Sequence, residues 1–182
     1  MITPDDQKIL WVASLKETFR LSQEVKMSSY IISTILELIP QQDPFRYIDE
    51  IISVNENDIT ASYRFKKDEF FYQGHFPDNP VTPGVILIEA MAQTGVVALG
   101  IFQLMLKGHD PQIIRTITPL FSFVDKVEFS AIVKPGERIM IKAQKIYYRR
   151  GNIQSNVVIE SENNKRICSG QLTGSGVILN EK

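Results

Sequence analysis

The sequence predicts an α+β domain in which an antiparallel sheet wraps around one long, buried helix. The helix is indicated by the most apolar run of the chain, Val85–Met105, which follows a Pro83-Gly84 pair typical of a helix start. The sheet is indicated by about six segments rich in β-branched and aromatic residues, most of them after the helix and joined by short turns. Short turns connect antiparallel strands, and a helix that is apolar on every face has to be covered. The sheet is therefore expected to enclose the helix.

The first residues are predicted to form a separate helix, because Thr3-Pro4 offers a capping hydroxyl and a proline for the first helical position. Residues 1–27 are accordingly interpreted as a helical appendage of unknown role, and residues 28–182 as a single domain. A second helix is expected to begin near Ser28 and to end before Pro40. Its apolar residues recur at helical spacing: Ile31, Ile32, Ile35, Leu36 and Ile39.

The strands are predicted from their residue types and from the turns between them. The predicted strands are Phe45–Val54, Ile59–Phe65, Ile113–Ile117, Leu120–Ala131, Arg138–Arg149, Asn152–Ser161 and Arg166–Ile178. The connections that carry turn residues are Asn55–Asp58, Lys134–Glu137, Arg150–Asn152 and Glu162–Asn164.

The composition is that of an ordinary globular protein and excludes several classes. A chain of 182 residues suits one domain with an appendage, and its 43% of hydrophobic residues is ample for a core. A formal net charge of -1 gives no overall positive field, so nucleic acid is not an expected partner. The single cysteine, Cys168, excludes an intrachain disulfide and a Cys-rich zinc site, and it fits a reducing, cytoplasmic location.

The apolar run Val85–Met105 is long enough to cross a membrane, but Glu89, Gln93 and Gln103 interrupt it. A buried core helix is therefore the preferred interpretation, and no membrane span is expected. A secretory signal is not expected either, because charged residues break up the apolar residues of the N-terminus: Asp5, Asp6, Lys8, Lys16 and Glu17.

One carboxyl group, Glu89, lies inside this apolar helix. Removing a carboxyl group from water favours its protonated form, which suits a group that donates a proton. Gln93 lies one turn further along the same face and is expected to hydrogen-bond Glu89. The alternative interpretation is a structural glutamate at the edge of the core, paired with a lysine or an arginine.

One histidine, His75, lies in a loop that Gly74, Pro77 and Pro80 restrict. Histidine titrates near physiological pH, so it is the usual general base. The alternative is a structural loop histidine, and His109, in a polar turn, is assigned to that class.

The helix start at Pro83-Gly84 supplies a third group. Backbone N–H groups at a helix start lack intrahelical partners and favour negative charge, and glycine lets a substrate carbonyl approach closely. Such a donor stabilises the enolate-like oxygen that forms when the carbon beside a carbonyl loses a proton. The alternative is a helix start without a catalytic role. Jointly, the base His75, the acid Glu89 and this donor predict an enzyme that abstracts that proton and expels a neighbouring hydroxyl.

This segment resembles the signature of the 3-hydroxyacyl-acyl carrier protein dehydratases of the FabZ type. The matching stretches are Gly74-His75-Phe76-Pro77, Asn79-Pro80-Val81, Pro83-Gly84-Val85 and Glu89-Ala90-Met91-Ala92-Gln93. Similar stretches also occur at Ile35–Pro40, Pro44-Phe45, Tyr47–Asp49, Phe70–Gln73 and Val133–Gly136. The resemblance extends from Tyr30 to Gly174 and implies the hotdog fold, an antiparallel sheet around one central helix.

The resemblance also implies a role for each residue of the site. His75 would remove the α-proton of a 3-hydroxyacyl thioester, Glu89 would protonate the leaving β-hydroxyl, and the Gly84 amide would hold the thioester carbonyl. The implied substrate-binding residues are Gly84, Phe76, Pro83, Val85 and Gln93. Each site is expected at the interface of a homodimer, or of a higher even-numbered homo-oligomer, with the histidine from one subunit and the acid from the other. Neither a metal nor an organic cofactor is expected.

The substrate is expected on an acyl carrier protein, with a coenzyme A thioester as the other carrier. Family members often carry a basic residue near residues 125–131 for docking the acidic carrier, but Glu128 and Ser130 stand at those positions here. The remaining basic residues for this contact are Lys126, Lys134, Arg149 and Arg150, which are equally well explained as solvated strand ends. Isomerase activity is not expected, because the acid is glutamate rather than the aspartate of FabA-type enzymes.

Two other functions fit the same fold. The first is an acyl thioesterase, in which the helix acid activates water against the thioester; the Gly-His-Phe-Pro loop around His75 favours elimination instead. The second is a non-catalytic subunit that binds an acyl chain or a carrier, against which the retention of both His75 and Glu89 argues.

Overall fold

The structure is a computed structural model that describes residues 27–178. The predicted appendage, residues 1–27, therefore lies outside the described residues except for Met27. A helix covers Met27–Leu38, which agrees with the predicted end before Pro40, and a compact unit begins at Ile35. Its elements are β1 (Glu50–Val54), β2 (Asp58–Arg64), the 3-10 helix η1 (Phe70–Gln73), α2 (Gly84–Ala92), the π-helical turn η2 (Gln93–Ala98), α3 (Leu99–Leu106), α4 (Pro111–Ile114), β3 (Ile117–Phe129), β4 (Arg138–Arg149), β5 (Asn152–Ser161) and β6 (Arg166–Ile178).

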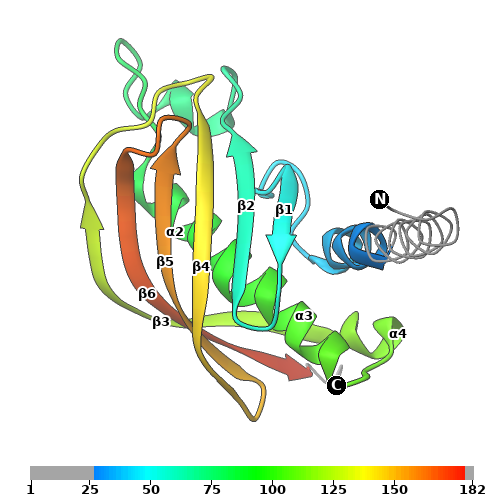
Figure 1. Cartoon of the computed structure of the whole chain (residues 1–182). Helices are drawn as coiled ribbons and strands as arrows, with labels where there is room; N and C mark the ends of the chain where they lie inside the picture. Colours follow the sequence, from blue (N-terminus) through cyan, green and yellow to red (C-terminus); the bar gives the residue numbers. More distant parts are fainter. Residues whose placement is uncertain (1–26, 179–182) are drawn as a thin grey trace, which may run out of the picture. The chain divides into compact units, whose positions relative to one another are not determined.

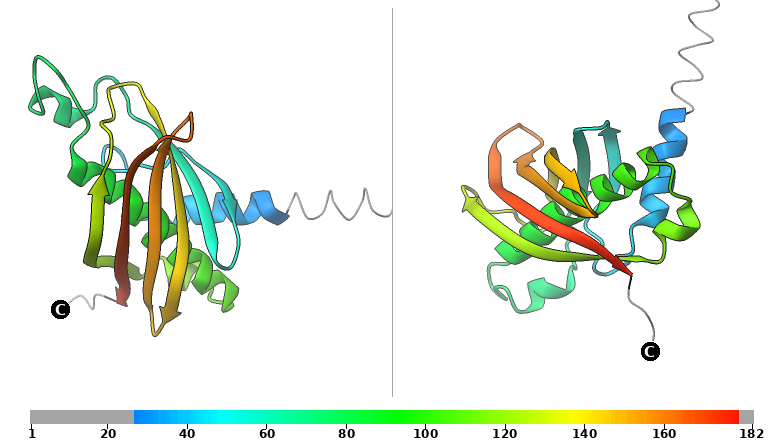
Figure 2. Two further views of the ribbon diagram at one scale, coloured as in Figure 1. Left: turned by 60° about the vertical axis from the view of Figure 1, so that its left-hand side comes forward. Right: turned by 90° about the horizontal axis from the view of Figure 1, so that it is seen from below.

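The described strands form one six-stranded sheet in the order β1-β2-β4-β5-β6-β3, and every neighbouring pair is antiparallel. The continuous helix α2–η2–α3 lies against the concave face of this sheet (Figures 1 and 2). The predicted α+β architecture, a sheet wrapped around one long helix, is confirmed. The order leaves β3 at one edge of the sheet, where the outer row of its backbone N–H and C=O groups pairs with no other strand among residues 27–178.

The central helix is a core element. Gly84–Leu106 is long and apolar enough to cross a membrane by length and composition, but 72% of its most apolar window is buried inside the protein. The helix approaches the sheet closely at Gly95, where an added Cβ would lie 2.6 Å from a methyl group of Val157. The Gly95 carbonyl accepts a 2.7 Å hydrogen bond from the Ser155 hydroxyl. The helix therefore packs on the sheet through its backbone, which only glycine allows here.

The strands β4, β5 and β6 match their predictions residue for residue, but two other predictions are wrong in part. Ile113–Ile117 is not a strand, because the Asp110 side chain accepts a 2.7 Å hydrogen bond from the Gln112 N–H and Pro111 occupies the first position of α4. The predicted strand Phe45–Val54 begins only at Glu50. Its first half does not pair with a strand, because the buried side chain of Gln93 forms hydrogen bonds with the main chain of Phe45 and Tyr47.

A buried carboxyl group, Glu69, supports the loop that leads to the predicted site. Only 6% of Glu69 is exposed, and its Oε1 accepts hydrogen bonds from the Tyr63 hydroxyl at 2.6 Å and from the Lys66 N–H at 3.0 Å. Burial raises the pKa of Tyr63, and the hydrogen bond to Glu69 raises it further, so the phenol remains a donor at neutral pH.

A matched pair of tyrosine variants tests this interaction. Tyr63→Phe is expected to lower the free energy of unfolding by about 1–3 kcal/mol, because it deprives a buried carboxyl group of a donor. Tyr47→Phe is expected to be neutral or stabilising, since the Tyr47 hydroxyl is buried and has no hydrogen-bond partner within residues 27–178. Urea denaturation of both variants measures the difference, and equal effects would contradict the assigned role of Tyr63.

Candidate active site

The loop around His75 is held by its own main chain. The His75 N–H donates to the Phe71 carbonyl at 2.9 Å, and the His75 carbonyl accepts from the Val81 N–H at 3.1 Å. The ring nitrogen Nδ1 lies 3.0 Å from the carbonyl oxygen of Val81. Because a carbonyl oxygen only accepts, Nδ1 must be the donor in this contact, and Nε2 of the neutral ring keeps its lone pair. The hydrogen bond to Val81 thus fixes the orientation of the half-buried imidazole and leaves Nε2 available for another partner.

The carboxyl group of Glu89 is half-buried and is held by Gln93, whose Nε2 donates a 2.9 Å hydrogen bond to Glu89 Oε1. The predicted contact between these two residues is therefore present. Gln93 itself is fully buried, and its Nε2 also donates to the Phe45 carbonyl at 2.8 Å. Its Oε1 accepts from the Tyr47 N–H at 2.7 Å. The amide is fixed at both ends, so it can present only a donor to Glu89 and fixes the direction of that carboxyl group.

The helix that carries Glu89 begins at Gly84, directly after Pro83. As the first helical residue, Gly84 has an N–H without an intrahelical acceptor, which suits it to bind an oxygen that gains negative charge. An added Cβ at Gly84 would lie 2.9 Å from the Phe129 ring, so glycine also lets the end of β3 pack against the helix start. The approach to the helix is fixed by Thr82, whose N–H donates to the Val133 carbonyl at 2.8 Å.

The two predicted catalytic side chains are held by different residues within one chain. In the described part of the protein, no hydrogen bond or ion pair joins His75 to Glu89, and each is held by other residues. Two predicted substrate-binding residues lie in the open, because 57% of Phe76 and 70% of Val85 are exposed. These two side chains are therefore not covered by other described residues of the same chain.

The edge strand β3 carries an exposed apolar surface that the sequence reasoning did not identify. Its large exposed residues are Leu120, Phe121, Phe123, Val124 and Phe129. Exposed apolar residues on a free strand edge are typical of a surface that another chain covers. The signal in the sequence was Leu120–Val124, where large apolar residues occupy both faces of the strand, whereas an edge strand with one solvated face would alternate.

The chain is similar to known proteins over this whole region. Residues 39–171 match the family of FabA-like domains. The 3-hydroxyacyl-acyl-carrier-protein dehydratase FabZ of Caldicellulosiruptor bescii is 38% identical over 144 residues, which cover 79% of this chain and 96% of that protein. The FabZ of Clostridium perfringens is 35% identical over 141 residues, covering 78% and 94% of the two chains.

A solved structure supports the fold independently of the sequence. The dehydratase heterocomplex ApeI:P from Xenorhabdus doucetiae superposes with a TM-score of 0.65 at 14% identity, over 81% of this chain and 91% of that one. The likeness confirms the predicted hotdog fold, while the sequence matches establish the family. The chain therefore belongs to the FabA-like family, with FabZ dehydratases among its relatives.

Proposed function

We propose that this protein removes water from a 3-hydroxyacyl thioester and releases the trans-2-enoyl thioester, as part of fatty acid or related acyl-chain synthesis. The observation that carries the proposal is the hydrogen bond from His75 Nδ1 to the Val81 carbonyl, which leaves Nε2 as the base. It occurs in a chain whose relatives are named 3-hydroxyacyl-acyl-carrier-protein dehydratases. A thioesterase needs only the helix acid to activate water. Elimination also gives a role to the oriented imidazole of His75, so it explains more of the observed arrangement than hydrolysis does.

The proposed reaction assigns one step to each group. His75 Nε2 takes the proton from the α-carbon, the C–H electron pair forms the new double bond, and the C–O bond to the β-hydroxyl breaks. Glu89 donates a proton to the leaving oxygen, which departs as water. The Gly84 N–H binds the thioester carbonyl and stabilises its developing negative charge. Glu89 gives up one proton and His75 gains one, so the elimination consumes no net proton, and the loss of a proton from His75 to solvent and its uptake by Glu89 restore both groups.

We propose further that the active form is a homodimer in which His75 of one subunit meets Glu89 of the other. Three features support this arrangement: the two residues share no hydrogen bond or ion pair within residues 27–178, Phe76 and Val85 are exposed, and the edge strand β3 carries exposed apolar residues. An interface that covers these surfaces would also exclude water from the reacting groups.

The proposed carrier of the substrate is an acidic acyl carrier protein in a cytoplasmic setting. Four exposed basic residues support this, because they offer cationic contacts for an acidic partner: Lys126, Lys134, Arg149 and Arg150.

The reaction is tested by incubating the protein with 3-hydroxyacyl and with plain acyl thioesters, each on acyl carrier protein and on coenzyme A, and weighing the products. Loss of one water from the hydroxyacyl substrates, with the thioester intact, is expected, and the carrier-bound form should react faster. Release of free thiol without loss of water would instead establish the thioesterase function, and no reaction with any thioester would favour a binding subunit.

A further inference from the structure

The loop that carries His75 is closed by a buried hydrogen bond between two side chains. The Tyr72 hydroxyl oxygen lies 2.7 Å from the Thr82 hydroxyl oxygen, and each of the two residues is only 6% exposed. Tyr72 belongs to η1, which precedes the loop, and Thr82 lies two residues before the first residue of α2. This hydrogen bond, which we call the Tyr72–Thr82 clasp, therefore joins the two ends of the segment that contains His75.

The loop has few other groups that can hold it in place. Three of its residues are prolines, which have no N–H to donate: Pro77, Pro80 and Pro83. Among the side chains of residues 70–84, only those of Tyr72, His75 and Thr82 form hydrogen bonds within residues 27–178. The imidazole of His75 is itself the group to be oriented, so the clasp is the side-chain contact that closes the loop around it.

The clasp holds the peptide group that orients the imidazole. The carbonyl oxygen of this group, from Val81, lies 3.0 Å from His75 Nδ1. Its N–H, from Thr82, donates to the Val133 carbonyl at 2.8 Å. Because the C=O and N–H of a trans peptide point in opposite directions, one rotation of the group would break both contacts. The Thr82 side chain, bound to Tyr72, opposes that rotation.

Thr82 also lies between the proposed base and the proposed donor. It directly follows the residue whose carbonyl orients His75, and it is separated from Gly84 only by Pro83, the N-cap of α2. A displacement of Thr82 would therefore move the imidazole and the Gly84 N–H relative to each other. Reacting groups must be held within about 0.5 Å of their productive geometry, and a misplacement of about 1 Å can lower the rate about 10²-fold.

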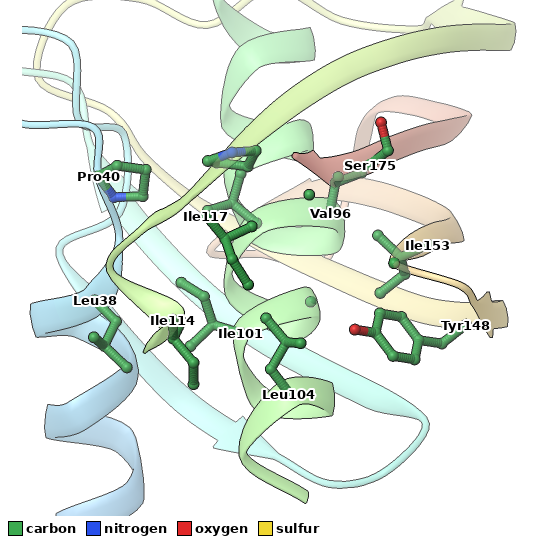
Figure 3. Close-up of a pocket in the computed structure, with 15 residues that line it drawn as sticks. Leu38, Pro40, Val96, Ile101, Leu104, Ile114, Ile117, Tyr148, Ile153 and Ser175 are labelled. Atoms are coloured by element: carbon green, nitrogen blue, oxygen red, sulfur yellow. The ribbon is translucent and has the colours of Figure 1, made fainter. Parts of the chain in front are cut away.

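The clasp acts on the site through position alone. Burial raises the pKa of Tyr72, so its phenol stays uncharged at neutral pH, and the clasp joins two neutral hydroxyl groups. Neither Tyr72 nor Thr82 lines the apolar cavity of about 70 Å³ beside α3 (Figure 3). Removing either hydroxyl therefore changes no charge at neutral pH and leaves the lining of that cavity as it is.

We infer that the Tyr72–Thr82 clasp positions the imidazole of His75 relative to the Gly84 N–H, so that both hydroxyls are positioning groups for the reaction. The inference rests on the proposed dehydratase function. Because both hydroxyls are buried away from the substrate, their loss should slow the chemical step and leave substrate binding nearly unchanged.

The kinetic test compares Tyr72→Phe, Thr82→Val and the double variant. Each single variant leaves one buried hydroxyl without its partner and should lower the free energy of unfolding, whereas the double variant removes both hydroxyls and should regain most of it. In all three, kcat is expected to fall about 10-fold or more while KM stays near the wild-type value. Urea denaturation measures stability, and initial rates with a 3-hydroxyacyl thioester measure kcat and KM.

Two further variants serve as controls. Thr82→Ser keeps the hydroxyl that Tyr72 binds, so its kcat should stay near the wild-type value. Tyr147→Phe removes the hydroxyl of an exposed tyrosine on β4 and should change neither stability nor kcat.

The tautomer of His75 gives a second readout that needs no substrate. The chain has two histidines, so NMR of the imidazole nitrogens can be assigned with His109→Ala. The neutral ring of the wild-type protein should carry its proton on Nδ1. In Tyr72→Phe and in the double variant, the form with the proton on Nε2 should gain population, because the Val81 carbonyl is no longer held against Nδ1.

The outcomes separate this inference from the function on which it rests. If kcat recovers together with stability in the double variant, or if the tautomer of His75 is the same in all clasp variants, the clasp has only a structural role and the inference is wrong, while dehydration stands. Failure of the wild-type protein to dehydrate any thioester would overturn the proposed function, and the NMR comparison would still decide whether the clasp orients His75. The double variant keeps the test decisive if a single variant does not fold.

Discussion

Replacing His75 by alanine is expected to lower kcat/KM for a 3-hydroxyacyl thioester on the order of 10²–10⁴-fold, the usual contribution of a positioned acid or base. The variant lacks the imidazole to which the proposal assigns the α-proton, while the helix start and the carboxyl group of Glu89 remain in place. Glu89→Gln should cause a loss of similar size, because the amide keeps the shape of the side chain but cannot donate a proton as a carboxylic acid does. Loss of water from the substrate, followed by mass spectrometry, measures both effects.

The matched control is His109→Ala, which removes the only other histidine of the chain. His109 is exposed at the end of α3, and its N–H donates to the Leu104 carbonyl, so its ring has no part in the proposed site. Wild-type kinetics are expected for this variant. Rates close to wild type in both His75→Ala and Glu89→Gln would refute the assigned roles and leave the binding-subunit interpretation.

Most of the fold could be predicted because its elements are specified locally. The central helix follows from a continuous apolar run after Pro83-Gly84, and β4, β5 and β6 follow from β-branched residues between clear turns. The errors arose where a side chain outside the segment decides the conformation. Gln93 holds the main chain of Phe45 and Tyr47 away from strand pairing, although it lies more than forty residues further along the sequence. Residue types within the segment carry no trace of that contact.

The candidate site likewise has features that residue types predict and features that depend on the folded chain. The chemistry proposed for it follows from residue types, because His75, Glu89 and the helix start offer a base, an acid and a free donor in one short segment. The tautomer of His75 and the fixed amide of Gln93 depend on distances to main-chain carbonyls, which follow only from the folded loop. The exposed surface of β3 depends on strand order, because the same residues would be covered in a central strand.

Two inactive variants are expected to restore activity when they share a dimer. If His75 of one subunit works with Glu89 of the other, a dimer of one His75→Ala and one Glu89→Gln chain has one intact site and one that lacks both groups. Random assortment makes half of the dimers mixed, so coexpression should give about one quarter of the wild-type rate. Either variant alone should remain on the order of 10²–10⁴-fold below wild type. The measurement is the initial rate of dehydration by the purified mixture of tagged chains.

The reciprocal experiment places both substitutions on one chain and coexpresses it with the wild-type chain. Shared sites predict that every mixed dimer is inactive, because each of its two sites lacks one group, so about one quarter of the full rate should remain. Sites within one chain predict about one half, since each mixed dimer then keeps one complete site. The same assumption predicts no restoration when the two single variants are mixed. A rate near one half with the double variant, together with no recovery in the mixture of single variants, would show that each chain forms a complete site by itself. The proposed site at the dimer interface would then be wrong.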